Sequence, residues 1–258
     1  MIRLAILGSG SSGNSAIVEC GGQRLLIDAG LSAKQLTLRL GQLGIEPTSV
    51  NAVLLTHEHG DHIRGLEVFL RKHPVAIHTT AHTAEVVRQS GVNAHWKTFE
   101  AGQTFSLGAV EIRSFAIQHD AVDPVGFVIT HDARKLGFVS DAGFVTRSMT
   151  EAMRGLHGLF IEANYDERLL EADTKRPWAT KQRIGSRHGH LSNRQVGELL
   201  REIAHTELRH VILGHLSSDC NQPDLALGHI RQSLTEAGQP HVAIACAHAD
   251  QPSGWFEV

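Results

Sequence analysis

Short apolar runs separated by glycine-rich turns make up the first part of the chain. Ile2–Leu7, Ala16–Cys20 and Arg24–Asp28 have the aliphatic and β-branched composition that is typical of strands. Between Leu31 and Leu43 the leucines are spaced as on one face of a helix, so this stretch is predicted to be helical. The chain is therefore expected to begin with neighbouring strands and to continue with a helix.

The rest of the chain alternates between predicted strands and predicted helices. Short apolar runs predict strands at Ala52–Leu55, Val75–His78, Val110–Ile117, Val125–Thr130, Leu136–Ser140, Leu159–Glu162, His210–Leu213 and Val242–Cys246. Periodic apolar positions predict helices at Ile63–Lys72, Ala81–Gln89, Arg147–Arg154, Asn193–Ile203 and Pro223–Ala237. No low-complexity linker divides the chain, and two sheets covered by helices suit this order. We therefore expect an α/β fold in a single domain, residues 1–258.

The composition is that of an ordinary globular protein. The chain has 258 residues, of which 41% are hydrophobic and 20% charged, so it can bury a substantial core and is not a disordered segment. No apolar stretch approaches the roughly 20 residues that cross a membrane, and the apolar start at Ile2 is too short for a signal sequence. Cys20, Cys220 and Cys246 are far apart and in no CxxC arrangement, which favours a reducing compartment. We therefore expect a cytoplasmic protein with no membrane contact.

The first predicted turn contains a motif that is also found in dinucleotide-binding proteins. Gly8-Ser9-Gly10-Ser11-Ser12-Gly13 matches the pattern GxGxxG, which must open a helix if it is to bind a dinucleotide. Here Ile17 and Val18 continue as a strand and Gly21-Gly22 closes the segment, so there is no room for that helix. The loop is therefore predicted to be a tight turn between strands, and an anion site formed by its backbone N–H groups is the alternative.

A dense cluster of potential metal ligands follows the predicted strand Ala52–Leu55. The chain has 18 histidines, and the cluster reads His57-Glu58-His59-Gly60-Asp61-His62. It is not the HExxH motif of zinc proteases, because an aspartate stands at the place of the second histidine. In the form HxHxDH, the first two histidines can point to one metal, and the last two ligands can turn toward a second. A solvated polar loop is the alternative, and the density of ligands argues against it.

The motif resembles that of the metallo-β-lactamase superfamily, and further matching positions follow in the same order. His119 comes after the run Val110–Ile117, Asp141 after Leu136–Ser140, and His215 after a third apolar run. The resemblance implies an αββα four-layer sandwich in which two mixed β-sheets are flanked by helices. It also implies that Asp28, in the string Leu26-Ile27-Asp28-Ala29-Gly30, orients the ligand loop rather than binding metal.

The same resemblance implies a site for two divalent transition-metal ions. Their expected ligands are His57, His59 and His119 for one ion, and Asp61, His62 and His215 for the other, with Asp141 bridging them. Imidazole and carboxylate ligands suit Zn²⁺ or Mn²⁺, and Fe²⁺ as well. The expected nucleophile is a metal-bridging hydroxide, which Asp61 can orient.

His190 is the histidine outside this ligand set that is expected to take part in the reaction. It precedes the last ligand, as does a histidine of RNase Z-like enzymes that assists the leaving group. It can therefore protonate the leaving oxygen or hold a phosphoryl oxygen. Two alternatives stay open: a place in the loop that caps the next helix, and replacement of His215 as a ligand.

Several local strings resemble one branch of the superfamily, the YycJ-like (WalJ-type) bacterial proteins near RNase Z and other phosphodiesterases. These strings span residues 9–15, 118–126, 161–166, 189–193 and 214–217. Members of that branch are metal-dependent 5′→3′ DNA exonucleases linked to DNA repair. The resemblance therefore implies a nucleic acid, or another phosphodiester, as the substrate.

Local charge supports a phosphate substrate, although the total charge does not. The chain has 24 basic and 27 acidic residues, a net charge of −3, so no overall basic field marks a nucleic-acid binder. Between Thr174 and Gly197, however, there are basic residues and no acidic ones. Positive charge concentrated in this way can hold phosphates, and a solvated basic face is the alternative. Trp178 in the same stretch could stack on a base, although a lone tryptophan more often belongs to the core or its rim.

Candidate substrate-binding residues come from this stretch and from the end of one predicted strand. They are Lys181, Arg183, Arg187, Ser192, Asn193 and Asn164. Asn164 and Glu162 follow the strand that ends there, and hydrogen bonding within the loop is an equally good interpretation of both.

Two other functions are compatible with the same ligands. One is hydrolysis of a thioester, lactam or other ester at a carbonyl group. The other is a metal-binding regulatory protein without turnover. The basic stretch favours the phosphodiester, and the complete ligand set argues against a protein without turnover. The fold by itself does not choose among these functions.

Overall fold

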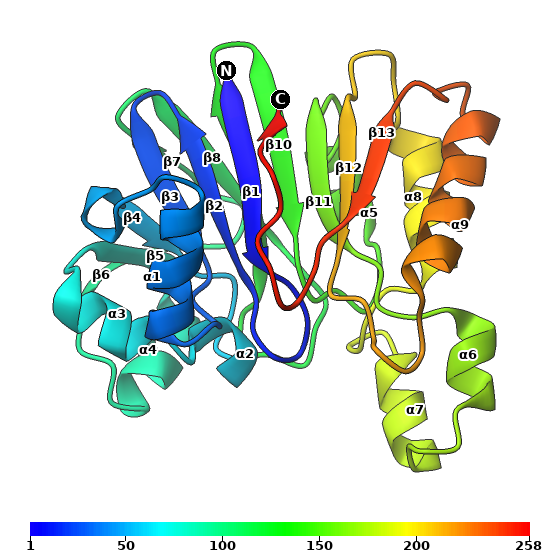
Figure 1. Cartoon of the computed structure of the whole chain (residues 1–258), viewed down its shortest axis with the longest axis horizontal. Coiled ribbons are helices and arrows are strands. Elements are labelled where there is room, and N and C mark those ends of the chain that lie inside the picture. The colour runs from blue at the N-terminus through cyan, green and yellow to red at the C-terminus, as the bar shows by residue number, and fades with distance from the viewer.

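Two seven-stranded β-sheets lie face to face in the computed structural model, which describes residues 1–258 (Figure 1). The first sheet contains β1 (Ile2–Gly8), β2 (Ser15–Cys20), β3 (Gln23–Ile27), β4 (Ala52–Leu54), β5 (Ala76–Thr80), β6 (His95–Phe99) and β14 (Phe256–Glu257), in the order β14-β1-β2-β3-β4-β5-β6. The second contains β7 (Thr104–Leu107), β8 (Val110–Ala116), β9 (Val125–His131), β10 (Arg134–Val139), β11 (Gly158–Glu162), β12 (His210–Gly214) and β13 (Ala243–Cys246), in the order β13-β12-β11-β10-β9-β8-β7. Each sheet mixes parallel and antiparallel neighbours.

Helices cover the outer face of each sheet. The first sheet carries α1 (Ala33–Gln42), α2 (Gly60–Ile63), α3 (Leu66–Lys72) and α4 (Ala81–Gln89), with a short 3-10 helix at Pro47–Ser49. The second carries α5 (Arg147–Ala152), α8 (Asn193–Ile203) and α9 (Pro223–Glu236). Two further helices, α6 (Glu167–Ala172) and α7 (Trp178–Ile184), project away from the sheets at the lower right of Figure 1. The predicted αββα sandwich is confirmed, and no helix is both long and apolar enough to cross a membrane.

Apolar side chains fill three layers, one between the sheets and one under each set of helices. The central cluster of 21 buried residues draws on both sheets, and Phe138 and Phe160 stack within it with ring centroids 4.4 Å apart. The outer clusters contain 18 residues on the first sheet and 24 on the second. Strands buried on both faces read as continuous apolar runs, which is why the sequence revealed them.

Most predicted elements are present, with ends shifted by a few residues. The helices predicted at Ala81–Gln89 and Asn193–Ile203 have those bounds, and the GxGxxG loop is a turn between antiparallel β1 and β2, as predicted. Sequence patterns missed β6, β7, β14, α6 and α7. Three of the five side chains of β6 are polar and exposed, and α7 has no buried residue. Neither segment therefore shows a clear apolar pattern.

One edge of the sandwich collects the carboxyl ends of several strands. β3 and β4 are parallel, and so are β10, β11 and β12. β8 runs in the same direction as β10, because each is antiparallel to β9. The residues that follow these strands therefore meet at the lower edge in Figure 1, near α2. The predicted ligands follow β4, β8, β10 and β12.

Candidate metal centre

The loop after β4 turns its first histidine into the protein. His57 is buried, and its Nδ1 lies 3.0 Å from the hydroxyl of Thr56. A proton on Nδ1 donated to that hydroxyl leaves Nε2 free to bind a metal. The Nε2 atom is buried without a hydrogen-bond partner, and so is Nε2 of His215 from the opposite sheet. Buried polar atoms normally have partners, so these two nitrogens fit the role of ligands to a metal ion.

The carboxylate of Asp28, directly after β3, holds this loop in place. Its Oδ1 accepts the backbone N–H of Thr56 at 2.8 Å, and its Oδ2 accepts the Thr56 hydroxyl at 2.8 Å. The same Oδ2 accepts Nδ1–H of His62 at 2.7 Å, which turns Nε2 of His62 toward the centre. This is the geometry that an orienting role for Asp28 requires.

Asp141, after β10, lies in the middle of the predicted ligands. Its Oδ2 is 3.5 Å from Nε2 of His62, 3.7 Å from Nε2 of His119 and 4.0 Å from Nε2 of His57. Its Oδ1 is 3.5 Å from Nδ1 of His215. Two imidazoles from each sheet therefore surround one buried carboxylate.

The ligand atoms form three overlapping groups, each with its atoms within 4.8 Å of one another, and Asp141 belongs to all three. The groups are His57, His59, His119 and Asp141; Asp61, His62 and Asp141; and Asp141, Glu162, His190 and His215. His215 also approaches the second group, because its Nε2 is 3.6 Å from Oδ2 of Asp61. This set of imidazole and carboxylate ligands, which includes the two nitrogens without hydrogen-bond partners, fits divalent transition-metal ions.

Charges in the cluster are strongly coupled. Burial lowers the pKa of His57 well below its ordinary value, and the neighbouring His62 adds to the effect. Burial also opposes protonation of His62 and His215, but nearby carboxylates outweigh it, raising the pKa of His62 well above normal and that of His215 to about 10. Burial disfavours the Asp141 carboxylate, yet the histidines around it, His215 first, hold its pKa well below the usual range. A metal that binds here would therefore replace protons.

His190 stands at the edge of the cluster and is held by Glu162, for which the sequence left open a place facing the site or a hydrogen-bonding role in the loop. Its Nδ1 lies 3.0 Å from Oε2 of Glu162, a fully buried carboxylate at the end of β11. Oε1 of Glu162 accepts the backbone N–H groups of Ala142 at 2.6 Å and Leu191 at 3.0 Å. Burial opposes protonation of His190, but Glu162 outweighs it and raises the pKa of His190 above its ordinary value. The strand-end position of Glu162, shared with the predicted ligands, was the sequence signal for it.

Residues of the GxGxxG loop and Asn14, which follows it, form hydrogen bonds to two of the predicted ligands. Asn14 donates from Nδ2 to Oδ2 of Asp61 at 3.1 Å, and its backbone N–H donates to the Asp61 carbonyl at 2.7 Å. The Ser9 hydroxyl accepts the backbone N–H of His215 at 2.8 Å. The loop's own N–H groups at Gly10 and Gly13 bond within it. The loop therefore positions ligands, and its N–H groups at Gly10 and Gly13 are not free to bind an anion.

The predicted substrate-binding residues after β11 are largely occupied by internal hydrogen bonds. Asn164 is buried, and its Nδ2 donates to the His215 carbonyl at 2.8 Å. Ser192 is the N-cap of α8 and forms a capping box, and buried Asn193 exchanges hydrogen bonds with Asn221. Ser192 is thus the N-cap that the alternative for His190 expected, and His190 lies in the loop before it. These placements give Asn164, Ser192 and Asn193 structural partners rather than an open surface.

Most cations of the basic stretch are also paired. Arg183 bonds Asp120 at 2.6 Å, and the amine of Lys181 donates to the backbone carbonyls of Glu171 and Asp173. Lys175, Arg176 and Arg194 likewise contact carboxylates. Arg187 has no carboxylate partner and lies over the ring of Phe144, with 4.8 Å from guanidinium carbon to ring centroid. The positive charge that the sequence shows is therefore mostly neutralised at this surface.

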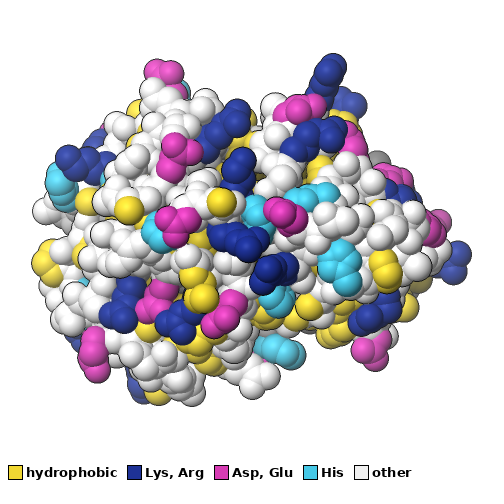
Figure 2. All heavy atoms as spheres, turned by 90° about the horizontal axis from the view of Figure 1, so that it is seen from above, with side chains coloured by type: hydrophobic (Ala, Val, Ile, Leu, Met, Phe, Trp, Pro, Cys, Tyr) yellow, Lys and Arg dark blue, Asp and Glu magenta, His cyan; other side chains and the backbone are white.

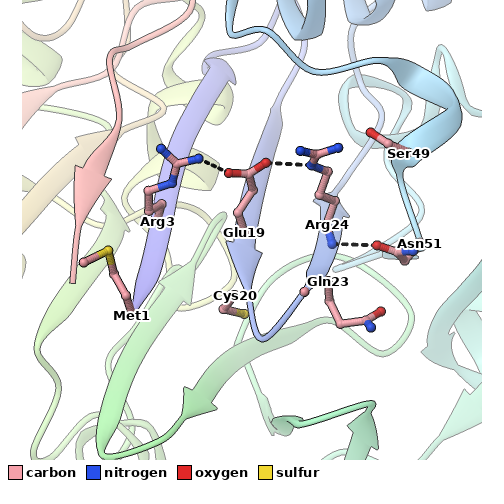
Figure 3. A pocket seen from close by; sticks show the side chains of 9 residues that line it. Met1, Arg3, Glu19, Cys20, Gln23, Arg24, Ser49 and Asn51 are labelled. Atoms are coloured by element: carbon pink, nitrogen blue, oxygen red, sulfur yellow. Dashed lines mark hydrogen bonds and ion pairs between the residues drawn. The ribbon is translucent and has the colours of Figure 1, made fainter.

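A hollow at the opposite end of the sandwich lacks the predicted ligands. Figure 2 views the end that carries both termini in Figure 1, where Lys and Arg side chains lie near the middle of the face. The hollow has a volume of about 600 Å³ and is lined by Met1, Arg3, Glu19, Cys20, Gly22, Gln23, Arg24, Ser49 and Asn51 (Figure 3). Glu19 bonds Arg3 and, at 2.6 Å, Arg24, so its charges are already paired. We therefore place the candidate site at the histidine cluster.

Fold and cluster together define a class of protein. A sequence model described as the beta-lactamase superfamily domain matches residues 23–216. The metallo-β-lactamase fold protein YhfI from Bacillus subtilis superposes with a TM-score of 0.74 at 16% identity, covering 100% of each chain, which shows the shared fold. The chain belongs to the metallo-β-lactamase superfamily.

Curated relatives narrow this assignment. The chain is 36% identical over 240 residues to the exodeoxyribonuclease WalJ of Streptococcus pneumoniae serotype 2, covering 91% of this chain and 89% of the relative. It is 32% identical over 240 residues to the exodeoxyribonuclease YycJ of Bacillus anthracis, covering 92% and 90%. The predicted resemblance to the YycJ-like (WalJ-type) branch is confirmed.

Proposed function

We propose that this protein is a metal-dependent nuclease that hydrolyses phosphodiester bonds in DNA from a strand end. The observation that carries the proposal is the cluster around Asp141, in which ligand atoms that follow strands of both sheets gather around one buried carboxylate and two imidazole nitrogens have no hydrogen-bond partner. Similarity to two proteins named exodeoxyribonucleases, along nine-tenths of the chain, supports DNA as the substrate.

The residues divide into two ligand sets with one carboxylate between them. His57, His59 and His119 would hold one ion, and Asp61, His62 and His215 the other, with Asp141 shared. We favour His215 over His190 as a ligand, because Nε2 of His215 is buried without a partner, whereas Nδ1 of His190 is bonded to Glu162. When bound, divalent ions lower the pKa of water and stabilise negative charge on a phosphoryl group. Zn²⁺ and Mn²⁺ are the ions proposed.

The chain's own residues supply positioning and proton transfer. Asp61 is one-fifth exposed and can accept a hydrogen bond from the attacking water while Asn14 fixes its carboxylate. His190 presents its Nε2–H away from Glu162, where it can protonate the leaving oxygen. Glu162 holds that proton on the ring by favouring the imidazolium form. In an in-line displacement the attacking water and the leaving oxygen lie on opposite sides of phosphorus, so Asp61 and His190 would act at opposite ends of the reacting P–O axis.

The ligands come from both halves of the chain, so we propose that residues 1–258 work as a single unit. The three cysteines are unpaired, which fits a cytoplasmic location.

The test is a panel of substrates offered to the purified protein with Mn²⁺ or Zn²⁺. It contains oligodeoxynucleotides labelled at either end, the matching oligoribonucleotide, a small phosphodiester and a thioester. We expect stepwise release of nucleotides from DNA, the polarity being read from the two labels, and loss of that activity in Asp141→Ala with the fold retained by circular dichroism. Hydrolysis of the thioester alone would refute the proposal, as would full activity of Asp141→Ala.

A further inference from the structure

Phe144 is an exposed aromatic residue directly beside the cluster. It follows Asp141 by three residues and forms an antiparallel β-bridge with Gln118, the residue before His119. Its neighbours turn inward, because Ala142 is buried and Val145 packs against the core, whereas Phe144 keeps 37% of its surface exposed. The bridge to Gln118 therefore holds a partly exposed aromatic ring between two segments that carry predicted ligands.

Arg187 is the basic residue that accompanies this ring. Its backbone is in contact with the segment that carries Phe144, since a Cβ added at Gly143 would lie 2.6 Å from the Arg187 carbonyl oxygen. The next residues continue into the centre: the His188 carbonyl accepts the N–H of Asp120, and the Gly189 carbonyl accepts Nδ1–H of His119. The guanidinium therefore stands over Phe144, two residues along the chain from the Gly189 carbonyl that accepts from His119, and it has no carboxylate partner.

We propose that Phe144 and Arg187 bind one nucleotide of the strand next to the bond that is cleaved. This inference rests on the proposed nuclease function and deepens it. The base stacks on the open part of the Phe144 ring, and the guanidinium of Arg187 pairs with a neighbouring phosphate. An unpaired base is free to turn onto the ring, whereas a base in the duplex must first leave its partner to do so, so the pair favours single-stranded ends over duplex ends.

Charge on the surrounding surface agrees with this occupant. Arg147, three residues after Phe144, is exposed and has no acidic partner, so two free cations flank the ring. A groove of about 480 Å³ begins at Phe144 and Arg147 and leads away from the centre along α8. Glu198 and Glu202 also line this groove, but they are paired with Arg194 and Arg154. Arg147 and Arg187 are therefore the cations left for phosphate near the ring.

The test compares a single-stranded oligodeoxynucleotide with the same strand made abasic at the nucleotide next to the cleaved bond. In the wild type we expect kcat/KM to be about tenfold higher for the intact strand, as one stacked base provides. Phe144→Ala and Phe144→Leu are expected to bring this ratio close to unity, and Phe144→Trp to preserve it. Leu38→Ala, an exposed apolar residue on α1, is the matched control and should keep the wild-type ratio. Arg187→Ala is expected to weaken the salt dependence of KM by about one ion.

A second readout needs no catalysis. With chelator present, 2-aminopurine at the same position should lose fluorescence on binding the wild type and Phe144→Trp, but not Phe144→Leu. A wild type that cleaves both strands equally, or a Phe144→Leu variant that keeps the ratio and the quenching, would overturn the stacking inference while the nuclease function stands. A wild type that cleaves no phosphodiester would overturn the proposed function, and this inference with it.

Discussion

Asp28→Asn tests whether one carboxylate positions both metal-binding arms of the loop after β4. Asp28 uses Oδ1 for the Thr56 N–H and Oδ2 for the Thr56 hydroxyl and His62 Nδ1–H. The Thr56 hydroxyl in turn lies 3.0 Å from Nδ1 of His57, so Asp28 also influences that histidine indirectly. Asparagine has the same shape and tolerates the φ of +56° at this position, but it has only one acceptor oxygen and no charge.

The magnitude follows from the bonds that are lost. With its oxygen on the Thr56 N–H, the new amide places its NH2 against both the Thr56 hydroxyl and His62 Nδ1–H. The hydroxyl can rotate and accept from the NH2, whereas the buried bond from His62 to a charged acceptor is lost, worth about 1.5–3 kcal/mol of stability in the metal-free protein. Loss of a residue that orients a metal-binding histidine typically lowers metal affinity by about 10- to 100-fold. Asp28→Ala removes every acceptor and adds backbone strain, so it should lose at least about 4 kcal/mol.

The assay is Zn²⁺ titration against a chromophoric chelator, together with urea unfolding of the metal-free protein. Asp132 provides the matched control, because it also has a left-handed backbone, with φ of +53°, but its side chain is 73% exposed. Asp132→Asn and Asp132→Ala carry the backbone effect alone. If Asp28→Asn binds Zn²⁺ as tightly as the wild type, the orienting role assigned to Asp28 is wrong.

Other predictions concern the backbone under the site, its protons and its proton donor. Gly30→Ala should abolish metal binding, because a Cβ there would lie 1.6 Å from the Asp61 carbonyl oxygen; metal content by mass spectrometry checks this. Metal affinity should rise as the pH increases toward 10, since His215, with its pKa raised to about 10, must lose its proton; calorimetry in buffers of different ionisation enthalpy should show proton release. Protonated His215 stabilises the metal-free fold through the carboxylates around it. This stabilisation is fully present below pH 6.5 and should be lost as the pH rises through about 10. Glu162→Gln should lower kcat at least about tenfold with metal content unchanged, and activity should decline at a lower pH, because Glu162 raises the pKa of His190.

Matched measurements separate these effects from general destabilisation. Gly41→Ala, where no atom lies within 4 Å of the added Cβ, should bind metal normally. Metal binding retained in Gly30→Ala would show that the Asp61 backbone can move to accommodate the Cβ without loss of the metal site, which would contradict the prediction. Metal affinity that does not change with pH would contradict the release of the His215 proton on metal binding. A Glu162→Gln variant whose activity has the wild-type pH profile would show that Glu162 has only a structural role.

The sequence determined the sheets and the ligand order because both depend on local pattern. Strands buried on both faces appear as apolar runs, and the turn after β1 could be recognised because the residues after Gly13 continue as a strand. The dependence on local pattern also explains why β6 and α7 were not predicted. β6 is largely polar and α7 has no buried residue, so neither has an apolar periodicity. The density of HxHxDH, followed by His119, Asp141 and His215 at strand ends, was enough to predict the family.

Tertiary structure decided which of these groups act together and which charges remain free. The strand-end position marked Glu162 as a candidate, but its partners follow only from the fold. Parallel β10 and β11 bring its carboxylate within hydrogen-bond distance of the Ala142 N–H and of His190. The basic stretch appeared free of acids in sequence, yet Arg183 meets Asp120 from a different loop, and only Arg187 stays unpaired over Phe144. Ligand order can be read along the chain because each strand end is local. Pairing of charges cannot, because ion pairs form across distances in sequence that only the folded chain closes.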